Sequence, residues 1–262
     1  MPTFSLPKIG SILDYMTYHY DEVPSTNDVA KELAKRAREQ KAIIIADTQT
    51  SARGRHGRHW ISPTGGVWLS FLLRPQITPE KITRLTFIAA TAAARTIQDT
   101  LDLAAEVKWP NDVLVNRKKL CGILTEATTR NNTVEYVVVG IGINANMGLQ
   151  AFPDSLQESV TTLEHELSYE TDCEALTRDL TQRFDQRYKR LQKGMWPTLL
   201  QEWRSLARFL GETVMVTSYA ETLVGKALDL DTEGALMIRL QNGTLKKVVT
   251  GDVALVAISP SG

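Results

Sequence analysis

Residues 42–73 read AIIIADTQTSARGRHGRHWISPTGGVWLSFLL, and this stretch decides how the chain folds. Two apolar runs, residues 42–46 and 67–73, flank a segment (residues 49–60, the cationic loop) that contains three arginines, two histidines and two glycines. Short apolar runs bounded by turn residues are typical of buried strands. The sequence therefore predicts two core strands joined by a cationic loop.

The cationic loop is unfavourable to hold in one conformation. Its like charges repel one another, and its glycines add conformational entropy that ordering must overcome. Arginine presents a planar fork of donors that suits phosphate and carboxylate oxygens, and nearby glycines let backbone N–H groups approach an anion. We therefore expect an anion or a polar ligand to order this loop.

Length and composition indicate a globular protein with one large and one small domain. The 262 residues are enough for a substantial core, and 30 Lys and Arg balance 30 Asp and Glu. Neutral net charge disfavours the alternative that the arginines bind nucleic acid, which usually needs a broad basic face. Two cysteines favour a reducing, cytoplasmic compartment. We find no signal peptide and no apolar run of roughly 20 residues that would span a membrane.

The remaining sequence predicts an α+β fold, in which a mixed sheet is covered by helices on one face. A first helix follows the cap residues 24–28, and apolar spacing predicts three more over residues 81–101, 172–192 and 195–208. Further strands are expected at residues 107–115, 120–126 and 134–144. In the last of these, two glycines indicate close backbone approach or a kink. We assign residues 1–208 to the large domain, with residues 1–20 as a lead-in. Short strands over residues 209–262 predict a small β-barrel domain.

Three turns carry polar side chains that a fold does not itself require: the cationic loop, the turn at residues 109–112 and the turn at residues 118–119. A lysine such as Lys119 supplies positive charge where negative charge develops, and Asp112 suits a hydroxyl group or Mg²⁺. These groups predict a site for a nucleoside triphosphate and a small carboxylate. The loop lacks the Gly-Lys-Ser/Thr ending of a phosphate loop. His56 and His59 stand among arginines that disfavour a bound metal.

Five motifs, in order along the chain, resemble those of the biotin–protein ligases. They are Ser25-Thr26-Asn27, Gln49-x-x-x-Arg53-Gly54-Arg55-x-Gly57-Arg58-x-Trp60, Lys108-Trp109-Pro110-Asn111-Asp112, Lys119-Leu120-x-Gly122-Ile123-Leu124-x-Glu126 and Gly140-Ile141-Gly142-Ile143-Asn144. The resemblance extends from about residue 20 to the C-terminus. It implies a class II synthetase-like catalytic domain followed by an SH3-like β-barrel.

The resemblance implies a two-step reaction. The biotin carboxylate attacks the α-phosphate of ATP, with Mg²⁺, to give biotinyl-5′-AMP, and a lysine of a biotin carboxyl carrier protein of acetyl-CoA carboxylase then takes the biotinyl group. Absence of the N-terminal DNA-binding module that some members carry implies the monofunctional type, with no DNA partner and no membrane partner. The family includes monomers and homodimers, and the sequence does not choose between them.

The resemblance also implies a role for each matching residue. Biotin would be held by Ser25, Thr26, Asn27, Gln49, Arg53, Gly54, Arg55 and Lys119. ATP or the adenylate would be held by Arg53, Arg58, Trp60, Asn111 and Asn144. Catalysis would involve Lys119, Arg55, Arg58 and Asp112. Within that group Lys119 would stabilise charge as the mixed anhydride forms, and Asp112 would orient Mg²⁺ or the incoming lysine.

Two alternative functions are weighed against biotin ligation, and the sequence departs from the family pattern at one position. Lipoate and octanoate ligases or transferases share the architecture and a lysine, but the arginine run and residues 108–112 favour biotin. Arg55, Lys119 and Asp112 disfavour a ligase-like binding protein without activity. Ala52 stands where the family usually has a glycine, and we expect its methyl group to limit positive φ and to alter biotin affinity or loop closure.

Overall fold

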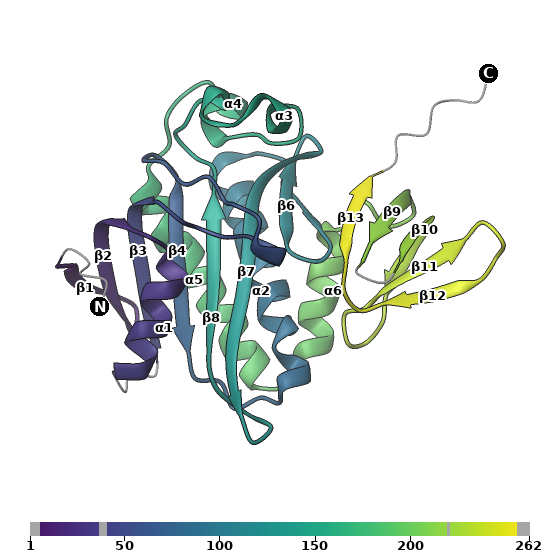
Figure 1. Cartoon of the computed structure of the whole chain (residues 1–262), viewed down its shortest axis with the longest axis horizontal. Coiled ribbons are helices and arrows are strands. Elements are labelled where there is room, and N and C mark those ends of the chain that lie inside the picture. Colours follow the sequence, from purple (N-terminus) through teal and green to yellow (C-terminus); the bar gives the residue numbers. More distant parts are fainter. Residues whose placement is uncertain (1–5, 37–40, 219–220, 256–262) are drawn as a thin grey trace.

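The computed structural model describes residues 6–36, 41–218 and 221–255. An eight-stranded sheet in the order β1-β2-β3-β4-β8-β7-β6-β5 forms the centre of the larger domain, and a five-stranded sheet lies beside it (Figure 1). In the described part of the large sheet, β2 and β3 pair in parallel and the other neighbours are antiparallel. The predicted α+β class with a mixed sheet is confirmed.

The predicted core elements occur in the expected order. The strands of the large sheet are β1 (Lys8–Ile12), β2 (Tyr15–Val23), β3 (Lys41–Gln49), β4 (Val67–Leu73), β5 (Glu106–Lys108), β6 (Asp112–Val115), β7 (Lys118–Arg130) and β8 (Thr133–Ile143). The helices are α1 (Thr26–Arg36), α2 (Thr83–Leu101), α3 (Asp154–Gln157), α4 (Leu163–Leu167), α5 (Cys173–Gln192) and α6 (Trp196–Leu206). The cationic loop joins β3 to β4, as predicted, while the short helices α3 and α4 were not foreseen.

Residues 6–20 are not a simple lead-in, so that prediction was wrong. They contribute β1 and most of β2, which extend the sheet at its edge. The side chains of β1 are almost all exposed, and an exposed strand has no apolar periodicity for sequence analysis to detect. Residues 1–5 lie outside the described part of the chain.

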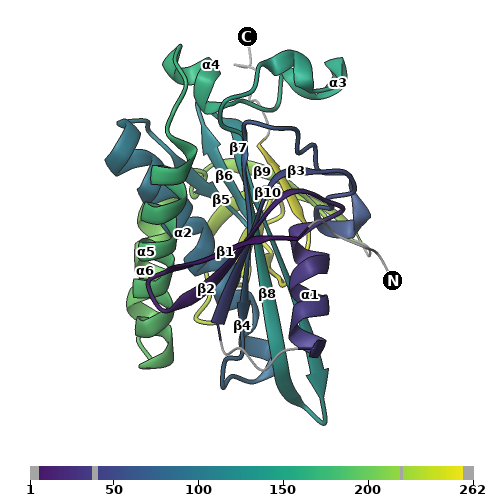
Figure 2. The ribbon, with the colours of Figure 1, turned by 90° about the vertical axis from the view of Figure 1, so that its left-hand side faces the viewer.

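Helices cover both faces of the large sheet, which corrects the expectation of one covered face. Figure 2 shows α1 on one side and α2, α5 and α6 on the other. On the α5 side, the ring of Phe71 in β4 stacks on Phe184 with centroids 4.1 Å apart. On the opposite side, Val29 and Ala30 of α1 pack in a cluster with Ile44 of β3. Every residue of β4 is buried, which explains why all of them but Ser70 are apolar.

The small domain is an antiparallel sheet of short strands. They are β9 (Thr213–Thr217), β10 (Thr222–Leu230), β11 (Leu236–Leu240), β12 (Leu245–Val248) and β13 (Asp252–Leu255). The sheet order is β12-β11-β10-β9-β13, so within the described residues no strand ladder closes the barrel between β12 and β13. Strand β13 was not predicted. Residues 219–220 and 256–262 of the predicted domain lie outside the described residues.

Hydrogen bonds attach the turn between β10 and β11 to the large domain. The indole Nε1 of Trp109 donates to the Gly234 carbonyl oxygen at 3.0 Å, and that of Trp196 donates to the Thr232 carbonyl oxygen at 2.7 Å. Arg84 of α2 forms an ion pair with Glu233 at 2.7 Å. These contacts fix the small sheet beside the turn that carries Asp112. No helix among the described residues has the length and apolarity to cross a membrane.

Candidate functional site

A cavity of about 580 Å³ lies where the cationic loop passes over β7 and β8, a volume in the range of small-molecule sites. Its walls come from the start of α1, the end of β3, the loop, the β5–β6 turn, β7, β8 and β13. They bring together most of the residues singled out from the sequence, namely Ser25, Thr26, Asn27, Gln49, Arg53, Gly54, Arg55, Arg58, Trp60, Asn111, Asp112 and Lys119.

At one end of the cavity, neutral polar side chains from α1 and β3 line the wall. The Gln49 side-chain oxygen accepts hydrogen bonds from the Thr26 backbone N–H at 2.8 Å and from the Thr26 hydroxyl at 3.1 Å. The Ser70 hydroxyl lies 2.7 Å from Thr26 Oγ1 and 2.6 Å from Asn27 Oδ1. Asn27 Nδ2 donates to Glu126 at 2.8 Å. Ser25, Thr26 and Asn27 are all buried, and the hydrogen bonds of Thr26 and Asn27 form a fixed array of donors and acceptors at the start of α1.

Glycines let this array and the floor of the cavity approach the sheet closely. A Cβ on Gly140 would lie 2.3 Å from Asn27 Oδ1, and one on Gly142 would lie 2.5 Å from Trp60 Nε1. Both distances are too short for any side chain, which confirms the close backbone approach predicted from the paired glycines. The Trp60 ring therefore lies directly on β7 and β8 and forms part of the cavity wall.

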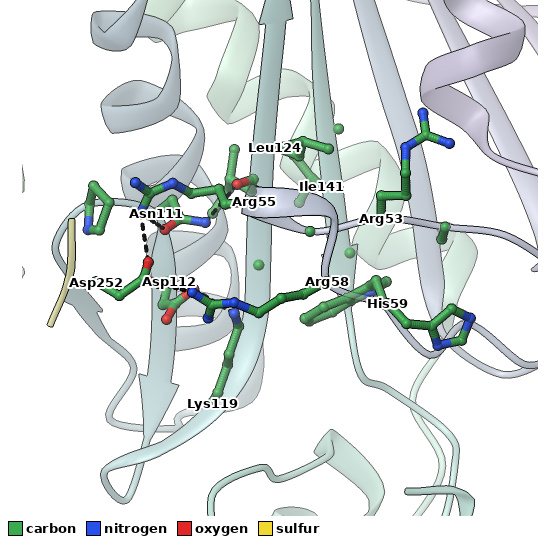
Figure 3. Close-up of a pocket in the computed structure, with 18 of the residues that line it drawn as sticks. Arg53, Arg55, Arg58, His59, Asn111, Asp112, Lys119, Leu124, Ile141 and Asp252 are labelled. Atoms are coloured by element: carbon green, nitrogen blue, oxygen red, sulfur yellow. Dashed lines mark hydrogen bonds and ion pairs between the residues drawn. The ribbon is translucent and has the colours of Figure 1, made fainter. Parts of the chain in front are cut away.

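The other end of the cavity holds the Asp112 carboxylate near Lys119 (Figure 3), and Lys108 approaches the same carboxylate. Asp112 Oδ1 lies 2.6 Å from Lys119 Nζ, and Oδ2 lies 3.2 Å from Lys108 Nζ. Burial alone would raise the pKa of the Asp112 carboxyl, but the two ammonium groups outweigh it and the pKa lies below its usual value. Lys119 Nζ also lies 5.2 Å from the centroid of the Trp60 ring, where a cation is attracted by the π face.

Asp112 does not fit the role of a Mg²⁺ ligand in this arrangement. Both of its oxygens face ammonium groups, which repel a divalent cation. Among the described residues, no group of three His, Cys, Asp or Glu side chains gathers as a metal site. The geometry makes Asp112 an anchor for Lys119 and Lys108.

The arginines of the cationic loop point in different directions. Arg53 turns towards α1 and forms two hydrogen bonds with the Asp28 carboxylate, while Arg55 and Arg58 extend towards Asp252 of β13 (Figure 3). Arg55 also reaches the Asn111 side-chain oxygen at 3.4 Å. Two of the three arginines therefore lie near the end of the cavity that contains Asp112.

The loop folds back on itself as a small hairpin. Gly54 N–H donates to the Arg58 carbonyl oxygen at 2.7 Å, and Trp60 N–H donates to the Ala52 carbonyl oxygen at 2.9 Å. Among the described residues of the loop, positive φ angles occur at His56 and Gly57. Ala52 is buried and has no positive φ, so the backbone limit that we expected at this position does not arise.

Asn144 is the predicted site residue that does not line the cavity. It is buried, and its Nδ2 donates to the Thr161 carbonyl oxygen at 3.1 Å. Its backbone N–H donates to the Leu120 carbonyl oxygen at 3.0 Å. These hydrogen bonds hold the segment after β8 against β7, one residue from Lys119, while the buried side-chain oxygen of Asn144 has no hydrogen-bond partner among the described residues. Its role towards ATP stays a prediction.

Several polar side chains that line the cavity or contact its lining were not assigned a role from the sequence, among them Asp28, Ser70, Glu126 and Asp252. Asp28 adjoins the Ser-Thr-Asn motif and Glu126 ends another motif, so both had a local signal. Ser70 is a lone hydroxyl in an apolar strand, a pattern that indicates a buried polar partner. No local pattern in the sequence indicates a role for Asp252, because its partner Arg55 lies almost 200 residues away.

Comparison with known proteins identifies the family. Residues 20–144 match the model of the biotin/lipoate A/B protein ligase family, and residues 209–256 match that of the biotin protein ligase C-terminal domain. The bifunctional ligase/repressor BirA of Bacillus subtilis is 35% identical over 242 residues, which cover 92% of this chain and 74% of that protein. The biotin–[acetyl-CoA-carboxylase] ligase of Paracoccus denitrificans is 31% identical over 226 residues, covering 82% and 90% respectively.

A solved structure agrees with the sequence relatives. The biotin protein ligase from Aquifex aeolicus in complex with biotin and ATP superposes with a TM-score of 0.80 and 26% identity, covering 93% of this chain and 99% of that one. The chain belongs to the biotin protein ligase family.

Proposed function

We propose that this chain joins biotin to a lysine of a carrier protein in two steps, at the expense of ATP. In the first, a biotin carboxylate oxygen bonds to the α-phosphorus of ATP and the bond to pyrophosphate breaks. In the second, a lysine amine attacks the acyl carbon, forms an amide, and releases AMP and a proton. The enzyme is then a carbon–nitrogen bond-forming ligase.

The observation that carries the proposal is the division of one cavity into an end lined by neutral polar side chains and a cationic end. The array at Thr26, Asn27 and Gln49 offers fixed donors and acceptors, which suit the neutral ureido ring of biotin. The cationic end, with Lys119 and Arg58, suits a carboxylate and a phosphate. A ligand with a neutral polar head and an anionic tail matches this order.

Lys119 is proposed as the catalytic residue for adenylate formation. Its ammonium group is held between the Asp112 carboxylate and the Trp60 ring, so it is oriented before the reaction begins. Negative charge builds up on the oxygens around the α-phosphorus in the transition state, and a positioned cation stabilises it. Arg55 and Arg58 are proposed to contribute in the same way from the loop.

Asp112 is proposed as a positioning residue, not as a metal ligand. Mg²⁺ is expected to enter with the ATP phosphates, where it neutralises part of their charge. The loop, folded over the cavity, would shield the acyl-adenylate from water. The proposed acceptor is the biotin carrier of acetyl-CoA carboxylase, in keeping with the names of the relatives from Paracoccus denitrificans and Mycobacterium tuberculosis.

Pyrophosphate release tests the substrate assignment. The protein is mixed with ATP and Mg²⁺, and biotin, lipoate or octanoate is added in separate reactions. We expect biotin to trigger release at least ten times faster than either fatty acid, because neither has a ureido ring for the polar array. Release with lipoate and none with biotin would overturn the assignment.

A further inference from the structure

The cationic loop poses an electrostatic problem within the fold. Arg53, Arg55 and Arg58 fall within six residues, and the neighbouring walls add Lys108 and Lys119. Such a cluster opposes its own folding unless anions lie within a few ångströms of it. Asp112 faces the two lysines. Two further carboxylates, one on each side of the loop, face the arginines.

The first carboxylate is Asp28, in the first turn of α1. Its oxygens accept hydrogen bonds from two nitrogens of Arg53, at 2.8 and 2.5 Å, in the bidentate geometry that arginine favours. The hydrogen bond with Arg53 is the main cause of a pKa for Asp28 below its usual value. Lys31 bridges Asp28 to Glu126 of β7, at 3.4 and 2.6 Å, so this partner is fixed to the sheet.

The second carboxylate is Asp252, at the start of β13 in the small domain. Its Oδ1 lies 3.0 Å from a terminal nitrogen of Arg55, and its Oδ2 pairs with Arg58. The Gly251 carbonyl oxygen accepts a hydrogen bond from the same Arg55 nitrogen at 2.9 Å. Asp252 pairs with Thr217 of β9, so its backbone is fixed within the small sheet.

We propose that Asp28 and Asp252 are positioning residues that clamp the cationic loop across the cavity, one from each domain. Asp28 holds the first half of the loop through Arg53. Asp252 holds the second half and keeps Arg55 and Arg58 beside the anion-binding end, so the small domain contributes to the site by orienting the arginines of the large one. The consequence for ATP rests on the proposed function, whereas the clamp itself does not.

Limited digestion with trypsin tests the clamp without reference to activity. Trypsin cleaves after arginine, so the loop carries its own cleavage sites. We expect Asp28→Asn and Asp252→Asn each to raise the initial rate of cleavage within the loop about threefold to fivefold, the range expected when an exposed ion pair is lost, and the double variant to raise it further. Glu212→Gln is the matched control, because Glu212 makes a bidentate pair with Arg117 that also joins the two domains away from the cavity.

The digestion has clear outcomes. Faster cleavage in both carboxylate variants, with the control unchanged, supports the clamp. Cleavage rates equal to wild type, or raised equally by the control, overturn it. Sites outside the loop are followed in the same digests by mass spectrometry, so that general unfolding is recognised.

Steady-state kinetics tests the consequence for ATP. We expect Asp252→Asn to raise KM for ATP about tenfold with a smaller change in kcat, because the arginines lose their preorganised position, and Asp252→Glu to restore most of the loss. A lower KM for ATP in Asp252→Asn would mean that Asp252 competes with phosphate, which contradicts the positioning role. If the wild type releases no pyrophosphate with biotin, the proposed function fails while the digestion still decides the clamp.

Discussion

Replacing Asp112 by Asn removes the charge that Lys108 and Lys119 share but keeps the shape of the side chain. The two ammonium groups lie 3.2 and 2.6 Å from the carboxylate. The Asp112 side chain is 13% exposed, and those of Lys108 and Lys119 are 19% and 29% exposed. In the variant, two cations face each other in a mostly buried pocket without an anion.

The expected loss of stability follows from this geometry. Breaking a buried ion pair by removing one partner costs about 3–5 kcal/mol. Because both lysines keep some contact with water, we expect the lower end, a loss of about 3 kcal/mol in the free energy of unfolding. Adding Lys119→Met to Asp112→Asn removes one of the stranded cations, so the double variant is expected to recover about 1–2 kcal/mol.

Urea unfolding at neutral pH measures these differences for the wild type, both single variants and the double variant. A loss below about 1 kcal/mol for Asp112→Asn would mean that the pair behaves as an exposed surface ion pair. Additive effects of the two substitutions would refute the direct coupling of Asp112 to Lys119.

Three further predictions concern residues around the same end of the cavity. Lys119→Ala is expected to slow biotinyl-AMP formation about 100-fold in single-turnover assays, and a rate equal to wild type would refute its catalytic role. Gly142→Ala forces a Cβ towards Trp60 and is expected to destabilise the fold by about 1–3 kcal/mol in urea unfolding; unchanged stability would contradict the contact. The ionised Asp112 carboxylate contributes its full stability above its usual pKa of 3.8, and this contribution is lost as pH falls through the lower pKa of the folded state. The difference in unfolding free energy between wild type and Asp112→Asn should therefore shrink below pH 3.8, and a constant difference through acid unfolding would refute this.

Local signals in the sequence predicted most elements of the fold. The apolar run of β4, the capped start of α1 and the alanine-rich face of α2 each contain their own pattern, which needs no distant partner. The edge strand β1 and the short β13 have no such pattern, because few of their side chains are buried. The second covered face of the sheet was missed for a related reason: the sequence of α1 shows that it packs, but not on which side.

The sequence predicted most of the residues that line the cavity, but it predicted few of the contacts between them. The order of the motifs assigned Lys119, Asp112 and the loop arginines to one predicted site, and in the structure these residues line one cavity. The partners of those arginines come from pairs distant in sequence, such as Arg55 with Asp252, and no local pattern reports them. Likewise, the sequence does not show that Asn144 donates to the Thr161 carbonyl oxygen and lies outside the lining of the cavity.

The central claim is that the two-ended cavity makes and transfers an activated biotin. The most direct measurement is the intact mass of a biotin carrier domain incubated with this protein, ATP, Mg²⁺ and equal amounts of biotin and lipoate. We expect the carrier to gain the mass of one biotinyl group, at one lysine, only when ATP is present. A carrier that gains a lipoyl group, or that stays unmodified while biotin-dependent pyrophosphate is released, would contradict the account.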